Sequence, residues 1–132
     1  MKPGMEAGQQ AEYQCAVTKE MFPCFEGEVI HPVYSTVSMV HHMEWTARKL
    51  ILPYLEENEE GMGTAVIMKH LAPAAEGSVI TLRAAITKIT GSLVTAEIKV
   101  YSETRLIGEG SVVQIILPKN EIARIIDNSK NG

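Results

Sequence analysis

The sequence predicts an α+β protein in which one long helix is wrapped by a curved antiparallel β-sheet. Residues 33–55 contain the one long stretch in which apolar residues recur at helical spacing. From Thr64 onward the period changes to two, which is typical of half-buried antiparallel strands. At 132 residues the chain is long enough for a sizeable core, and we expect a single domain spanning 1–132.

Composition excludes several classes of function. The net charge is −4 and no basic block occurs, which argues against nucleic acid as a partner. Charges or prolines interrupt the longest apolar runs, so no membrane span is expected, and the first residues lack the apolar core of a signal peptide. Cys15 and Cys24 form no ligand-spaced cluster and are expected to be reduced thiols. We therefore expect a cytoplasmic protein without metal or cofactor.

Two segments precede the helix. Residues 12–17 are expected to form a first strand. Residues 19–32 contain three turn-forming residues and predict irregular structure, but they also carry five large apolar side chains. So many apolar residues in a loop suggest that this segment packs over something as a lid.

The long helix has clear boundaries. Ser35 and Thr36 are good N-cap residues, and Pro53 ends the pattern because it lacks an N–H group. The apolar stripe expected to face the core comprises Thr36, Val40, Met43, Ala47, Leu50 and Ile51. Glu44 lies within this stripe, and loss of water there would raise its pKa unless a partner compensates. Pairing with Arg48 at i,i+4 is the simple structural alternative.

Four strands are expected after the helix. Residues 56–63 predict an acidic turn whose glycines permit a tight reversal, before a strand that ends near His70. The alternating segments 80–87 and 94–100 share a buried face only if their loop has an odd number of residues, which predicts a three-residue loop with left-handed Gly91. Residues 105–117 form a further strand, and 122–126 a short helical turn.

This order of elements is that of the hotdog fold, in which a small sheet curls around a single helix. Such a sheet usually completes its burial by pairing with a second copy. We therefore expect a homodimer or a dimer of dimers.

Three motifs fall in matching order and spacing. They are Ser-Thr-x-x-Met-Val-x-x-Met-Glu-Trp at 35–45, Leu-Pro-Tyr-Leu-Glu at 52–56 and Gly-Thr-Ala-x-x-x-x-His at 63–70. With them, nearly the whole chain resembles the fluoroacetyl-CoA thioesterase family of hotdog proteins. The resemblance implies a catalytic set of Thr36, Glu44 and His70, with Gly63 helping to position the acyl group.

The chain departs from the family pattern at two places. Gln114 stands where the family has an Arg on the last strand, and Gly27 and Ile30 stand where its lid carries Phe. We expect Gln114 and Ile30 to contact substrate. Because the family's Arg and Phe recognise the fluorinated acyl group, the resemblance implies an acyl-CoA thioesterase for a small acyl group, without fluoroacetyl selectivity.

The residues suit thioester hydrolysis in their own right. A desolvated Glu44 could attack the carbonyl or deprotonate water, and an imidazole at position 70 titrates near neutrality. The helix N-terminus beside Thr36 offers free N–H groups to an oxyanion. His41 and His42 point about 100° apart on a helix, which argues against a metal site with Glu44 and favours two polar-face residues.

The residue pattern leaves two other functions open. One is a hotdog enoyl-CoA hydratase or dehydratase, which also uses a histidine and a carboxylate. The other is a non-catalytic acyl-CoA-binding module.

Overall fold

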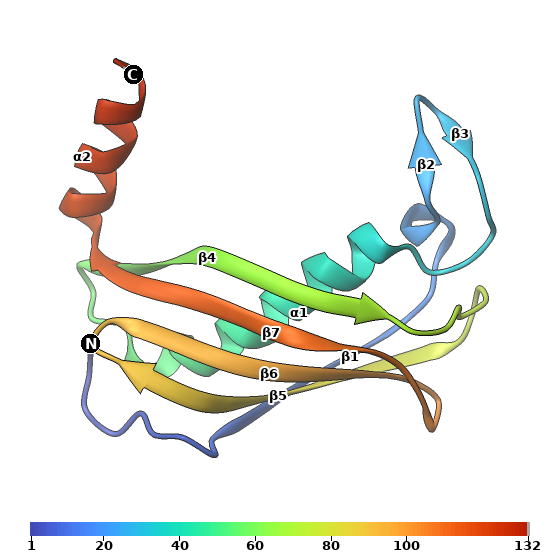
Figure 1. Ribbon diagram of the computed structural model, residues 1–132, viewed down its shortest axis with the longest axis horizontal. Helices are drawn as coiled ribbons and strands as arrows, with labels where there is room; N and C mark the ends of the chain where they lie inside the picture. The colour runs from blue at the N-terminus through green and yellow to red at the C-terminus, as the bar shows by residue number, and fades with distance from the viewer. Residues whose placement is uncertain (132) are drawn as a thin grey trace.

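A computed structural model describes residues 1–131. A five-stranded antiparallel sheet in the order β1-β5-β6-β7-β4 curls around the helix α1 (Figure 1). The predicted hotdog arrangement is therefore present. In chain order the elements are β1 (Gln10–Ala16), the 3-10 helix η1 (Lys19–Met21), β2 (Cys24–Phe25), β3 (Glu28–Val29), α1 (Thr36–Ile51), the 3-10 helix η2 (Leu52–Tyr54), β4 (Glu59–His70), β5 (Val79–Thr90), β6 (Leu93–Ser102), β7 (Arg105–Pro118) and α2 (Lys119–Ser129).

Helix α1 begins and ends as predicted, but its buried face differs from the expected stripe. The residues that face the core are Met39, His42, Met43, Thr46, Ala47, Leu50 and Ile51. Thr36 and Glu44 are exposed, and Val40 is only half-buried. The expected stripe was right for Met43, Ala47, Leu50 and Ile51. It was wrong for the rest because two polar residues of α1 enter the core, where both form hydrogen bonds. Hydrophobicity alone could not place them there.

The β5–β6 hairpin meets the predicted requirement for a shared buried face by a different route. Its loop has two residues, since Thr90 pairs with Leu93, and Gly91 has φ +60° as expected. For the apolar residues of both strands to share one face, one strand needs one extra residue relative to the other. A β-bulge between Ile86 and Lys88 supplies that residue. The three-residue loop was therefore wrong, although the argument that predicted it was sound.

The glycines of the predicted acidic turn lie inside β4 instead. At Gly61 a Cβ atom would stand 2.4 Å from Cδ1 of Ile51. This glycine therefore allows close packing of β4 against α1 and does not reverse the chain.

Two peripheral elements stand clear of the sheet. The β2–β3 hairpin occupies the segment predicted to be an irregular lid, and Phe25, Val29 and Ile30 are exposed on it. Helix α2 is longer than the predicted turn and buries none of its residues. Both elements extend past the edge strand β4 in Figure 1. Within residues 1–131, no helix has both the length and the apolar character needed to cross a membrane.

Candidate active site

Thr36 and His70 meet where the start of α1 approaches the end of β4. The distance from Thr36 Oγ1 to His70 Nδ1 is 2.8 Å. The neighbouring Ser35 caps the helix, because its side-chain oxygen accepts a hydrogen bond from the Ser38 N–H at 3.0 Å. The Thr36 hydroxyl is therefore free for chemistry. Two of the three predicted catalytic residues come together.

His70 is held in a partly desolvated position. Burial lowers its pKa below the ordinary 6.5 and outweighs the opposite effect of the Ala72 backbone. Its other ring nitrogen, Nε2, is buried and has no hydrogen-bond partner within residues 1–131. The imidazole is therefore neutral at physiological pH, with Nδ1 on Thr36 and Nε2 available to a further group.

A pocket of about 570 Å³ adjoins this pair. Phe22, Phe25, Val33 and Val37 line it, together with Glu20 and His31. The pocket thus lies between the hairpin segment and the first turn of α1. Ile30, which we expected to contact substrate, is 48% exposed on the hairpin and does not line this pocket.

Glu44 lines a second pocket of about 240 Å³ with Gly63 and Gln114. The structural alternative for Glu44, a pair with Arg48, is absent, because Arg48 binds Glu60 through two hydrogen bonds of 2.7 and 3.1 Å. That interaction lowers the pKa of Glu60. The Glu44 carboxylate is exposed and does not lie in a desolvated stripe.

Gln114 forms part of the floor of this second pocket. It lies opposite Gly63 in the β4–β7 register and is 6% exposed. Its Nε2 atom is buried and has no hydrogen-bond partner among the described residues. A buried amide without a partner is costly and is commonly satisfied by a water or a ligand.

The predicted site residues therefore fall into two groups within one chain. Thr36 and His70 line one pocket, while Glu44, Gly63 and Gln114 line the other. Along a regular helix Thr36 and Glu44 are separated by about 12 Å, at ~1.5 Å per residue. Glu44 and the imidazole do not converge on one cavity in the isolated chain.

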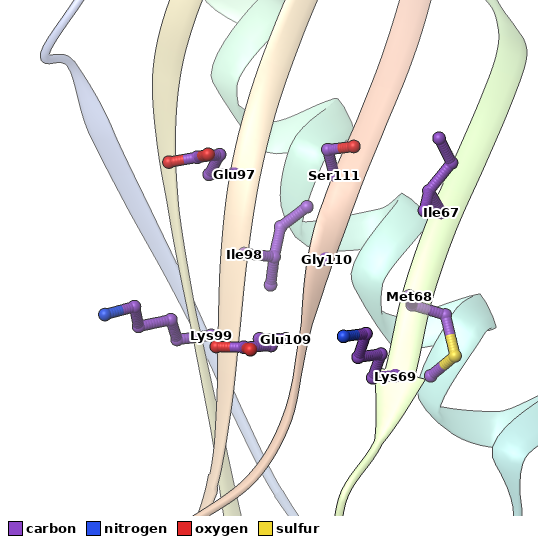
Figure 2. A pocket seen from close by; sticks show the side chains of 9 residues that line it. All are labelled: Ile67, Met68, Lys69, Glu97, Ile98, Lys99, Glu109, Gly110 and Ser111. Carbon is purple, nitrogen blue, oxygen red and sulfur yellow. The ribbon is translucent and has the colours of Figure 1, made fainter.

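A third depression, of about 380 Å³, lies on the face of the sheet turned away from α1 (Figure 2). Alternating charges line it, with Lys69 and Lys99 near Glu97 and Glu109. None of the candidate residues reaches it. Its mixed charges favour a solvated surface over a site for the CoA phosphates. In residues 1–131 no group of three His, Cys, Asp or Glu side chains is placed to hold a metal ion.

Tyr34 and His42 form a buried polar pair near the site that the sequence did not predict. His42 was expected on the polar face of α1 with His41, but it is 8% exposed and its Nδ1 lies 2.7 Å from the Tyr34 hydroxyl. His41 is exposed as expected. A sequence signal for the burial of His42 did exist. His42 and Thr46 are four residues apart and therefore lie on one side of the helix, next to the apolar Met43.

Comparison with known proteins shows which chains this one is similar to. The profile of the fluoroacetyl-CoA-specific thioesterase family matches residues 17–120. The fluoroacetyl-CoA thioesterase of Streptantibioticus cattleyicolor is 27% identical over 117 residues, which cover 84% of each chain.

Two solved structures extend this comparison. A Thermus thermophilus protein described as a thioesterase superfamily member is 40% identical, has a TM-score of 0.92, and is matched over 98% of this chain and 96% of its own. A hot-dog-like protein from Thermanaerovibrio acidaminovorans is 16% identical with a TM-score of 0.88, covering 99% of this chain and 95% of its own. The second likeness is one of fold alone.

Proposed function

This chain belongs to the fluoroacetyl-CoA-specific thioesterase family and is a thioester hydrolase, and we propose that it hydrolyses a small acyl-CoA at the Thr36–His70 pair. The observation that carries this proposal is the 2.8 Å hydrogen bond between Thr36 Oγ1 and His70 Nδ1 beside a pocket of about 570 Å³. A neutral imidazole bonded to a hydroxyl at a helix N-terminus can move protons next to a site that favours an oxyanion.

In this mechanism each residue has one role. Thr36 orients and polarises the thioester carbonyl, and the free N–H groups of the first turn of α1 stabilise the negative oxygen. Glu44 supplies the carboxylate, which attacks the carbonyl or deprotonates water. If Glu44 attacks the carbonyl, CoA leaves as a thiolate, and His70 passes to it a proton from the water that hydrolyses the resulting anhydride. If Glu44 deprotonates the attacking water, His70 passes that proton from the carboxyl group to the CoA thiolate.

The separation between Glu44 and the Thr36–His70 pair is resolved if two chains share each site. Within residues 1–131, strand β4 is an edge strand that pairs only with β7, so its other edge is open. On α1, Val37 and Trp45 are 75% and 42% exposed. A second copy that pairs along β4 would cover these residues and set the two α1 helices side by side. Glu44 of the partner subunit would then complete the site.

The acyl preference follows from Gln114. Its neutral amide occupies the place of the family's Arg, so we propose that fluoroacetyl-CoA gains no advantage over acetyl-CoA. Comparable kcat/KM for the two substrates supports this assignment, whereas a strong preference for fluoroacetyl-CoA contradicts it.

The test of the proposal is release of free CoA thiol from a series of short acyl-CoA substrates. His70→Ala should lower kcat by about 100- to 10,000-fold, the usual contribution of a general acid–base group. Lys69→Ala is the control, because Lys69 is next to His70 on β4 but lines the depression on the face of the sheet turned away from α1. Undiminished turnover by folded His70→Ala protein would refute the assignment.

A further inference from the structure

Tyr34 and His42 form a neutral, buried polar pair beside the candidate site. Neither residue has a role in the mechanism above. Tyr34 is 0% exposed, and its hydroxyl lies 2.7 Å from Nδ1 of His42. Burial raises the pKa of Tyr34 and lowers that of His42. Both side chains are therefore uncharged at neutral pH, and a hydrogen bond joins the hydroxyl to the imidazole nitrogen.

Tyr34 also links the two segments that carry the reactive residues. It stands two residues before Thr36, and its backbone N–H donates to the Ala74 carbonyl at 2.9 Å, in the segment that follows β4. An isolated β-bridge between Val33 and Ala75 reinforces this connection. The start of α1 and the end of β4 are thereby fastened together at Tyr34.

The ring of Tyr34 is in edge-on contact with the ring of His70. Their centroids are 6.5 Å apart and the ring planes meet at 72°. The ring of the tyrosine therefore faces the imidazole of His70, while its hydroxyl is held by a hydrogen bond to His42 on α1. A side chain fixed at its far end can restrict the orientation of the ring that it touches.

We propose that Tyr34, anchored by its hydrogen bond to His42, is a positioning residue that keeps the His70 imidazole on Thr36 and away from water. The inference rests on the proposed function, because it assigns His70 to the reaction. His42 lies outside the pocket of about 570 Å³, and Tyr34, which borders that pocket, acts in this scheme through the orientation of His70.

The surroundings of the two histidines define what can change their titration. His70 faces Thr36 and Tyr34, and the pocket beside it also contains Glu20, Cys24 and His31. The groups near His42 are Tyr13 and Cys15 of β1, Tyr34, and the adjacent His41. Loosening Tyr34 changes none of these charges. It exposes His70 to water, which raises the pKa of His70 toward 6.5.

The test compares Tyr34→Phe, which removes only the hydroxyl, with His42→Leu, which removes its hydrogen-bond partner. We expect each to lower kcat about tenfold with little change in KM, because misorientation of a reactive group slows the chemical step. The acid limb of the pH–rate profile should move to higher pH in both. The double variant should be no slower than either single one, since both remove the same hydrogen bond.

Two further variants separate positioning from simple stabilisation. His42→Gln keeps a hydrogen-bond acceptor and should restore most of kcat. Tyr13→Phe alters the other aromatic neighbour of His42, whose ring lies 5.3 Å away, and should behave as the unmodified protein. Lower thermal stability of Tyr34→Phe and His42→Leu with an unchanged kcat and pH profile would overturn the inference.

An NMR titration of the His70 ring protons tests the positioning role of Tyr34 independently of the proposed function. A pKa of His70 that rises in Tyr34→Phe supports the positioning role even if His70→Ala retains activity. A pKa that stays unchanged refutes it even if His70→Ala is inactive.

Discussion

Two inactive variants should restore each other's activity if each site uses Glu44 from one subunit and the Thr36–His70 pair from the other. Glu44→Gln and His70→Ala are each expected to have little activity alone. In a mixed dimer, two-fold symmetry places both substitutions in one site and leaves the other site intact.

The size of the recovery follows from counting sites. Random exchange of equal amounts makes about half of the dimers mixed, and half of the sites in each mixed dimer are intact, so about a quarter of the original activity should return. The variants carry different affinity tags, are co-expressed or mixed until subunits exchange, and are assayed by thiol release. Size-exclusion chromatography with light scattering confirms that the species is a dimer.

The 2.8 Å contact between Thr36 and His70 supplies a matched control. These two residues lie in one chain, so Thr36→Ala mixed with His70→Ala should leave every site of a mixed dimer damaged and recover nothing. If Glu44→Gln and His70→Ala mix fully and the activity stays at the mean of the two parents, the shared site is refuted. A purely monomeric protein would refute the dimer itself.

The remaining predictions concern protonation and helix capping. Burial lowers the pKa of His70, and its neutral form is the active one, so the midpoint of the acid limb of kcat/KM should lie below pH 6.5. A midpoint above pH 6.5 would contradict this sign. Ser35→Ala should lower the free energy of unfolding by about 1 kcal/mol in urea titrations, because it removes the cap on Ser38 N–H, whereas Thr36→Ala should lose activity with almost no loss of stability. Equal destabilisation by the two substitutions would show that the capping and catalytic roles are not divided in this way.

The sequence predicted where the helix and strands lie better than it predicted which of their sides are buried. Periodicity located α1 and the strands because each has one apolar side that must be buried. It placed Glu44 in the core wrongly, since two polar residues of α1, His42 and Thr46, occupy that side through hydrogen bonds with Tyr34 and with the helix backbone. Such partners come from distant positions and cannot be deduced from spacing.

The site shows the same division. The motifs identified Thr36 and His70, which the fold brings together from positions 34 residues apart. They could not show that Glu44 faces a separate pocket, because a motif gives the spacing of residues along the chain and not the side of α1 that packs against the sheet. The alternating pattern showed that one extra residue was needed between the two strands. It could not show that a bulge near Lys88, and not a longer loop, would provide this residue.

The β2–β3 hairpin forms a sheet of its own, and Phe25 and Val29 on it are 65% and 53% exposed. Amino-acid replacements there disturb neither the curved sheet nor the proton-transfer pair, because the hairpin contributes no buried residue to the core. One wall of the proposed substrate pocket, which Phe25 lines, can thus change while the Thr36–His70 pair stays as it is. Related chains can acquire new acyl preferences by altering this appendage, with no need to rebuild the scaffold that carries it.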